Sequence, residues 1–194
     1  MGRNRIAWAS AAALMVATLG VAAVPAQATA TTTATTTACP TGWGSQAETR
    51  SAATSDSVTN IRTGRHACFD RMVVDVPGAS TRELGYSVRY VSRLYQDGSG
   101  RHIAVGGGAV IEVRVAAPAY DPATGKPTYP AKAGQRLTGV NLTGYRTFRD
   151  ARFVGSFEGD TQIGLGVRAR LPFRVWVAAD RVVVDVAHNW TGAR

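Results

Sequence analysis

The sequence predicts an all-β protein, an antiparallel β-sandwich or a related closed sheet, in a single domain. From Trp43 onward, short runs rich in Val, Ile, Tyr and Phe are interrupted by Gly, Pro or Asp-Gly, at intervals of about 8 to 12 residues that are typical of antiparallel sheet proteins. No stretch has the apolar period of about 3.6 residues that indicates a helix. The chain of 194 residues is long enough for one core of this class.

Each of these runs is expected to form one strand, and turn-forming residues separate them. Asp97-Gly98-Ser99-Gly100 has the composition of a hairpin turn, and the glycines at 106–108 mark a second turn or a bulge. Residues 118–130 contain half of the prolines, which indicates a long surface loop. The expected strands are residues 68–76, 86–95, 102–105, 110–116, 136–143, 151–157, 162–170, 173–177 and 181–187.

Two of the expected strands have almost the same sequence. Residues 70–76 (DRMVVDV) recur as residues 180–186 (DRVVVDV). Because side chains alternate across a strand, Met72 and Val74 share one face, while Arg71 and Asp75 share the other. The repeat indicates two strands adapted to the same sheet environment, and a degenerate duplication is the alternative.

The charges in the repeat restrict how the two strands can pair. An antiparallel register with Val73 opposite Val183 sets each arginine opposite an aspartate, whereas a parallel in-register pairing opposes like charges, at a cost of roughly some tenths of a kcal/mol per pair. We therefore expect either antiparallel neighbours or no adjacency. The crossed pairs would be Arg71 with Asp185 and Asp75 with Arg181.

The first 28 residues have the features of a secretory signal peptide. Two arginines precede an uncharged, mostly apolar run at 6–24, and Pro25-Ala26-Gln27-Ala28 supplies the small residues of a cleavage site. An uncleaved membrane anchor is the alternative, but the run is rich in alanine and only just long enough to span a bilayer. We expect residues 1–28 to be removed, which leaves an exported protein without a transmembrane segment. Residues 29–42, which are rich in Thr and Ala, are expected to form a linker.

The chain has two cysteines, Cys39 and Cys68. An isolated pair in an exported protein is most simply a disulfide, so we expect these two residues to be bonded. Metal or redox chemistry is the alternative. It is disfavoured because there is no C-x-x-C motif, and His66 alone beside Cys68 is too small a cluster for zinc.

The charge balance predicts an anionic partner. Lys and Arg number 22 and Asp and Glu 13, which gives +9, and removing a leader that holds Arg3 and Arg5 leaves 20 − 13 = +7. A basic protein attracts anionic surfaces and polymers. Because export separates the protein from nucleic acid, no nucleic-acid partner is expected.

Six segments are the basis of a family resemblance: Asn60-Ile-Arg-Thr-Gly-Arg-His66, Phe69-Asp-Arg71, Gly85-Tyr-Ser-Val-Arg-Tyr90, Ala109-Val-Ile-Glu-Val-Arg-Val115, Phe157-Glu-Gly159 and Arg181-Val-Val-Val-Asp185. In this order they resemble the AMIN-like domain of secreted actinobacterial proteins, over residues 43–190. The resemblance implies a β-sandwich module located in the cell envelope. AMIN domains attached to amidases and secretin pores are similar to peptidoglycan-binding or septum-targeting modules. No catalytic domain accompanies the module here, and the resemblance identifies no site residue.

The sequence lacks the motifs of known catalytic and metal sites. It contains no G-x-S-x-G, H-E-x-x-H, P-loop or EF-hand loop, and His66, His102 and His188 are far apart. No catalytic residue, metal or cofactor is therefore expected. The remaining enzyme hypothesis is an acid/base pair of Asp75 and Asp185. Charge pairing is preferred, because each shares its strand face with an arginine.

The strongest binding candidate is an alternating pattern late in the chain. If one strand runs through Pro172, it places Arg168, Arg170, Arg174 and Trp176 on one face, and the proline confines that strand to an edge or a bend. Guanidinium groups bind carboxylate or phosphate, and tryptophan stacks on sugar faces, which suits peptidoglycan or an anionic wall polymer. An ordinary solvated outer face is the alternative.

These observations predict an exported, non-catalytic, cell-wall-associated protein that binds peptidoglycan or an anionic wall polymer. Two alternatives remain open. One is a secreted enzyme with an unrecognised carboxylate or histidine site, and the other is a secreted protein-interaction or inhibitor module.

Overall fold

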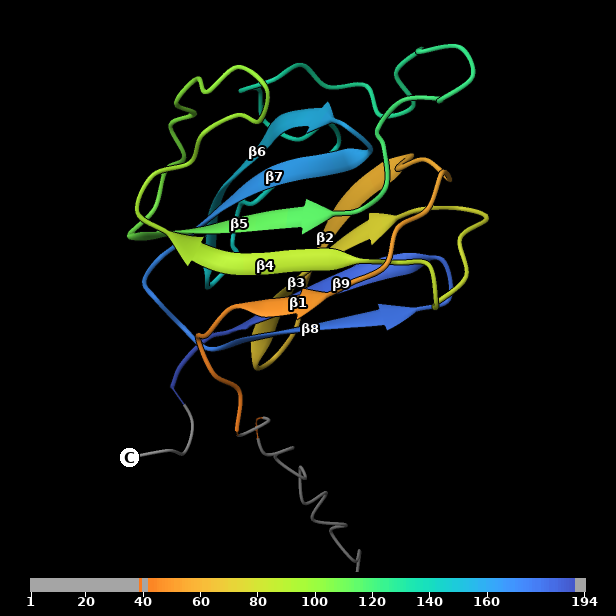
Figure 1. Cartoon of the computed structure of the whole chain (residues 1–194). Helices are drawn as coiled ribbons and strands as arrows, with labels where there is room; N and C mark the ends of the chain where they lie inside the picture. The colour runs from red at the N-terminus through yellow and green to blue at the C-terminus, as the bar shows by residue number, and fades with distance from the viewer. Residues whose placement is uncertain (1–38, 40–41, 191–194) are drawn as a thin grey trace, which may run out of the picture. The chain divides into compact units, whose positions relative to one another are not determined.

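The computed structural model describes Cys39 and residues 42–190. In this part of the chain, nine strands form two antiparallel sheets and no helix is present (Figure 1). The five-stranded sheet has the order β1 (Glu48–Arg50), β4 (Tyr86–Val91), β5 (Ala109–Val115), β7 (Asp160–Val167) and β6 (Phe148–Phe157). The four-stranded sheet has the order β2 (Asn60–Arg65), β3 (Phe69–Asp75), β9 (Arg181–Ala187) and β8 (Phe173–Ala178).

The predicted leader and most of the predicted linker lie outside the described residues. Residues 1–28 are wholly outside, and of residues 29–42 only Cys39 and Gly42 are described. In the part that is described, no helix is long and apolar enough for a membrane crossing.

The two sheets pack face to face around one apolar core. Met72 and Val74 of β3 and Val184 of β9 point inward from the four-stranded sheet, and Ile111 and Leu165 point inward from the five-stranded sheet. All five side chains are fully buried. The all-β prediction is confirmed, in its sandwich form, because the two sheets are separate and are not closed into a barrel.

Seven of the expected strands are present with small shifts at their ends, and two are not. The prediction of a strand at 136–143 was wrong: only Arg136 forms an isolated bridge. Gly139 and Gly144 have φ of 76° and 78°, in the left-handed region that ends an extended strand. The prediction at 102–105 was also wrong, since only His102 forms a bridge there.

Two strands of the structure, β1 and β2, were not expected. They contain almost no apolar residues: Ile61 is the one aliphatic side chain in β2, and β1 has none. Hydrophobic alternation therefore could not reveal them. Both lie at a sheet edge, where one buried neighbour is enough to hold a strand.

The residues between β4 and β5 cover the outer face of the five-stranded sheet. Leu94 and Ile103 are buried there in a small apolar cluster separate from the main core. Gly166 on β7 makes this close approach possible, because a Cβ at that position would overlap the carbonyl oxygen of Gly106. This sheet therefore presents no open, flat face to a ligand.

The repeated strands pair as the charges predicted. β3 and β9 are antiparallel neighbours, with Val73 opposite Val183. The two crossed positions are Arg71 opposite Asp185 and Asp75 opposite Arg181. The expected antiparallel register is confirmed.

Candidate functional site

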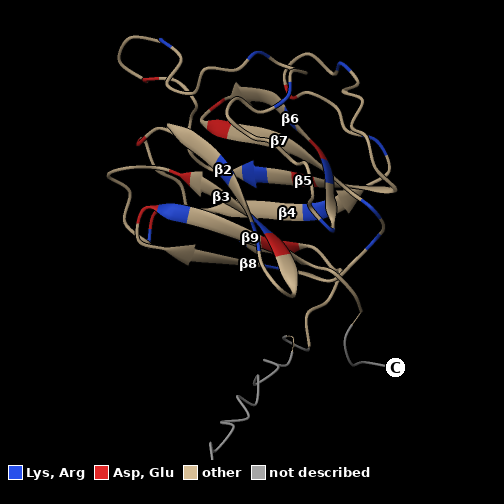
Figure 2. Ribbon diagram, turned by 180° about the vertical axis from the view of Figure 1, so that it is seen from behind, with Lys and Arg blue, Asp and Glu red and all other residues tan. Residues whose placement is uncertain are grey.

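The outer face of the four-stranded sheet carries the main concentration of arginine and aromatic side chains. Figure 2 views the molecule from this side and shows basic and acidic positions on β9, with no described loop drawn across the middle of β3 and β9. The arginines are accessible: the side chains of Arg62 and Arg174 are 48% and 42% exposed. This is the one flat sheet surface that the described chain leaves open.

A buried carboxylate organises the centre of this face. Asp185 on β9 is fully buried and accepts two hydrogen bonds from Arg71, at 2.6 Å from Nε and 2.9 Å from Nη2. Arg174 Nε and Trp176 Nε1 donate to the same carboxylate at 3.0 and 3.3 Å. Two-point binding fixes the plane of the Arg71 guanidinium group on β3. Arg174 on β8 is held by one hydrogen bond to Asp185 and by its contact with the Trp43 ring.

Aromatic rings lie beside both guanidinium groups. The Arg174 guanidinium lies over Trp43, with its Cζ 4.5 Å from the ring centroid, and the Arg71 Cζ is 5.1 Å from Phe69 and 5.2 Å from Trp176. Such cation–π contacts contribute about 0.5 to 2 kcal/mol each. We call this surface the arginine–aromatic face; its residues are Trp43, Phe69, Arg71, Arg174 and Trp176.

The disulfide positions the segment that carries Trp43. Cys39 is bonded to Cys68, which confirms the predicted disulfide. Cys68 directly precedes Phe69 on β3, and the ring of Phe69 lies 5.6 Å from that of Trp43. The N–H of Phe173 also donates to the Gly44 carbonyl at 2.8 Å, so the segment is attached to β8 as well.

The face has an excess of positive charge at its centre. Arg71 and Arg174 share the single negative charge of Asp185. Arg174 donates a hydrogen bond from Nε, and among the described residues none accepts a hydrogen bond from its Nη1 or Nη2. These two groups therefore remain available as donors to a ligand. A negatively charged ligand would balance the positive charge that Asp185 leaves uncompensated on Arg71 and Arg174.

Acidic groups around this face are already engaged. Glu48 on β1 accepts a hydrogen bond from the Val175 N–H at 2.9 Å, and burial raises the pKa of its carboxyl above the ordinary value. A hydrogen bond from Arg181 lowers the pKa of Asp180. Asp75 is paired with Arg62 at 2.8 Å. The nearby Arg174 guanidinium lowers the Glu48 pKa and offsets part of the rise caused by burial, so Glu48 compensates part of the positive charge at the centre.

The structure divides the four predicted binding residues among separate places. The prediction of one strand through Pro172 was wrong, because β7 ends at Val167 and β8 begins at Phe173 in the other sheet. Arg174 and Trp176 lie together on the arginine–aromatic face. Arg168 and Arg170 lie in the connection between the sheets.

The two arginines of the connection bind different parts of the chain. Arg168 donates from Nη2 to the carbonyl of His188 and to Oδ1 of Asn189. Arg170 donates from Nη2 to the carbonyl oxygen of Ser45 at 2.8 Å. Its guanidinium group lies over the ring of Tyr90, which is on β4 of the five-stranded sheet. These four residues therefore do not form one stripe.

The structure confirms the charge pairing preferred for Asp75 and Asp185 and contradicts the alternative of an acid/base pair. The register places each aspartate opposite an arginine, and the two carboxylates lie four positions apart along the sheet. Asp75 pairs with Arg62, and Asp185 pairs with Arg71. Among the described residues, no three His, Cys, Asp or Glu side chains gather as a potential metal site.

Sequence reasoning missed Trp43, Phe69 and Arg71 as members of the face, although two signals were available. The β8–β9 hairpin pairs Ala178 with Arg181, which sets Arg174 opposite Asp185. The predicted β3–β9 register sets Arg71 opposite the same aspartate, so the two registers together bring Arg71 and Arg174 to Asp185. The predicted disulfide likewise implied proximity of the segments that follow each cysteine.

Comparison with known proteins gives one match. A family model described as the AMIN-like domain matches residues 56–188. No curated protein and no solved structure matches the chain.

Proposed function

The chain belongs to the AMIN-like domain family, and from this premise we propose that it is an exported, non-catalytic protein of the cell envelope that binds peptidoglycan or an anionic wall polymer. AMIN-like domains are binding domains often found in cell-envelope proteins. A role related to the cell wall is therefore a property of the family, and the ligand is our proposal.

One observation carries the proposal: two guanidinium groups, stacked among three aromatic rings, share one buried carboxylate on an open sheet face. Guanidinium donors recognise carboxylate and phosphate oxygens, which are the anionic groups of bacterial wall polymers. Trp43 and Trp176 offer flat apolar surfaces beside these donors, as sugar rings require. The combination suits an acidic glycopolymer better than a plain polyanion.

We expect the protein to be retained on purified cell walls and released by salt, because exposed charges are screened over about 8 Å at physiological ionic strength. Arg174→Gln should weaken retention about tenfold or more, since a charge-assisted hydrogen bond contributes about 1.5 to 3 kcal/mol. This variant leaves Arg71 on Asp185, so the fold is preserved. The measurement is co-sedimentation of the purified protein with walls across a range of wall concentrations.

Arg89→Gln is the matched control. Arg89 is also an exposed arginine bonded to a buried carboxylate, Glu112, with Nε 2.9 Å from Oε2, but it lies on the other sheet. Glu112 keeps its bonds to Arg114 and Gln162, and the net charge change is the same. If both variants weaken wall retention equally, the net charge of the protein, and not the arginine–aromatic face, determines binding to the wall. No retention of the wild type would favour the protein-interaction or inhibitor module.

Export is a separate part of the proposal, based on the leader-like sequence of residues 1–28. Secreted protein is expected to begin near Thr29, and its two cysteines should resist alkylation until a reductant is added. Intact mass with and without reduction measures both features. A mass that includes residues 1–28 contradicts cleavage, and two thiols that react without reductant contradict the disulfide in the secreted form.

A further inference from the structure

A pocket of about 180 Å³ lies beside the disulfide, at the end of the sandwich where the chain passes from β9 to Asn189. Trp43 forms part of its wall, so the pocket is continuous with the arginine–aromatic face, of which Trp43 is also a member. Its lining residues are Cys39, Trp43, Ala67, Cys68, Arg146, Ala187, His188 and Asn189.

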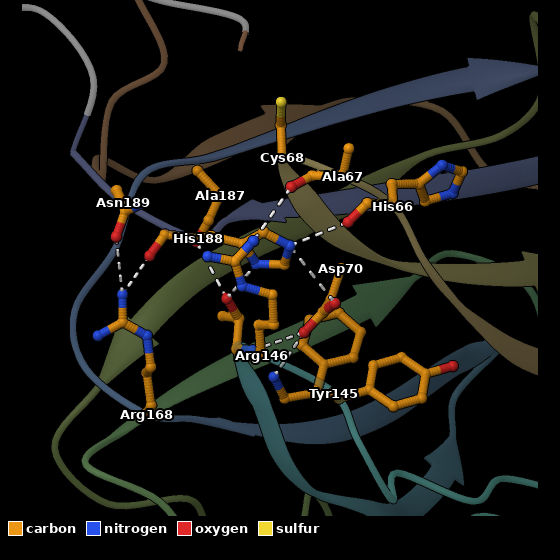
Figure 3. Close-up of polar contacts among 12 residues, drawn as sticks. His66, Ala67, Cys68, Asp70, Tyr145, Arg146, Arg168, Ala187, His188 and Asn189 are labelled. Carbon is orange, nitrogen blue, oxygen red and sulfur yellow. Dashed lines mark hydrogen bonds and ion pairs between the residues drawn. The ribbon is translucent and has the colours of Figure 1, made fainter. Parts of the chain in front are cut away.

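His188 forms a rigid part of the pocket. Its side chain is buried, with Nδ1 3.0 Å from the hydroxyl of Thr147 and Nε2 3.0 Å from the carbonyl of His66 (Figure 3). Both ring nitrogens are therefore occupied within the protein. The imidazole joins the start of β6 to the turn before β3 and keeps the pocket in one shape.

One buried carboxylate, that of Asp70, lies behind the pocket wall beside His188. Asp70 is 1% exposed, and its Oδ2 accepts the N–H groups of Thr147 and Phe148 at 2.6 and 3.0 Å. Its second oxygen lies 4.0 Å from His188 Nε2 and has no hydrogen-bond partner. Asp70 thus orients the chain below the pocket and does not pair with the arginines at its mouth.

Arg146 lines the pocket, and Arg168 lies next to it, bonded to two of its lining residues, His188 and Asn189. Arg146 reaches the carbonyl of Ala67, with Nη1 3.4 Å away, and Arg168 donates to the carbonyl of His188 and to Asn189 (Figure 3). The ion pairs between described residues include neither Arg146 nor Arg168. Backbone carbonyls orient these groups but leave their full charges uncompensated, unlike those of Arg71 and Arg174.

We propose that this pocket binds a phosphate group, as the phosphodiester of a wall polymer. Arg146 and Arg168 come from different strand ends, and guanidinium groups donate hydrogen bonds to phosphate oxygens. A diester continues on both sides of its phosphorus, so the adjoining sugar or polyol can extend over Trp43 toward the arginine–aromatic face. This inference rests on the proposed function and specifies the anion.

The test follows the protein by ¹H–¹⁵N NMR during titration with inorganic phosphate, glycerol 3-phosphate and acetate. We expect both phosphates to shift the indole signal of Trp43 and the amide signals of His188 and Asn189 in a saturable way, while acetate leaves them in place. The double variant Arg146→Gln/Arg168→Gln should raise the dissociation constant for both phosphates about tenfold or more.

Arg101→Gln is the matched control, because Arg101 is likewise exposed and bonded to a backbone carbonyl, that of Ala133 at 3.3 Å. It should leave phosphate binding unchanged. Since Arg168 also holds the segment at Asn189, Arg146→Gln alone is the second variant, and thermal unfolding confirms that each protein is folded. Equal shifts with acetate, or an unchanged dissociation constant in Arg146→Gln, would overturn the proposal.

Cell walls before and after removal of their phosphate polymers separate this inference from the proposed function. Loss of retention on stripped walls, together with weak retention of Arg146→Gln/Arg168→Gln on intact walls, supports the phosphodiester. If wall retention instead depends on Arg174, while neither the Arg146→Gln/Arg168→Gln variant nor stripping of the walls has an effect, phosphate binding in the pocket is contradicted. That result still supports the proposed function. If phosphate binds in the pocket but the protein is not retained on walls, the pocket is a site for free phosphate. That result contradicts the proposal that the ligand is a wall polymer.

Discussion

Asp185→Ala is expected to lower the free energy of unfolding by about 3 to 5 kcal/mol, because it removes one partner of a buried ion pair and leaves the other uncompensated. The carboxylate is fully buried and accepts four hydrogen bonds from Arg71, Arg174 and Trp176. Arg71 is itself only 23% exposed, so water cannot fully replace the lost carboxylate. Urea denaturation followed by circular dichroism measures the change.

Asp180→Ala provides the comparison. Asp180 is also paired with an arginine, Arg181, at 2.7 Å, but its side chain is 37% exposed. A solvent-exposed ion pair contributes little to stability, so the free energy of unfolding of this variant should remain near that of the wild type. Similar losses for the two variants would show that burial of Asp185 does not set the cost. Where Asp185→Ala stays folded, wall retention should also fall, since Arg71 and Arg174 lose their fixed orientation.

Removal of the disulfide by Cys39→Ala/Cys68→Ala is expected to lower the free energy of unfolding by about 3 to 4 kcal/mol, from the entropy of closing a loop of this length in the unfolded chain. The bonded cysteines are 29 residues apart. The loop contains β1 and β2, which are edge strands with one neighbour each.

The measurement is the difference in unfolding free energy between oxidised wild type and the double variant. Wild type in the presence of reductant should match the variant, which separates the loss of the bond from the loss of the sulfur atoms. The near-ultraviolet signal of Trp43 should change in parallel, because the bond holds the segment of Trp43 beside Phe69. If the denaturation midpoint is unchanged both in the double variant and in reduced wild type, strand pairing alone holds the segment in place.

Local sequence patterns predicted the strands whose side chains alternate, and they failed where alternation was absent. β3 and β9 were recognised from their valines, and their charges determined the register, because only the antiparallel pairing opposes Arg71 to Asp185 and Asp75 to Arg181. β2 was missed because Ile61 is its one aliphatic residue. The strand expected at 136–143 failed because Gly139, within it, has a left-handed φ of 76° that ends the extended conformation.

The site was less predictable, because it depends on which face the rest of the chain covers. Alternation at Arg168, Arg170 and Arg174 looked continuous in sequence, yet the chain crosses from one sheet to the other between Val167 and Phe173. No local signal marks that crossing except Pro172, which is compatible with a bend or an edge. The stripe was therefore broken by the packing of two sheets, which only the tertiary structure shows.

The sequence by itself determined the all-β class and the disulfide, from short periods and from a pair of cysteines, and its complementary charges restricted the repeated strands to antiparallel pairing or no adjacency. The tertiary structure then showed that the two strands are antiparallel neighbours. The tertiary structure decided where a ligand can bind. It placed residues 92–108 over one sheet and left the other open, and it brought Trp43 onto Arg174 and Arg146 beside His188. Those contacts join residues distant in sequence, and their energy depends on the packing of the whole sandwich, which no local pattern encodes.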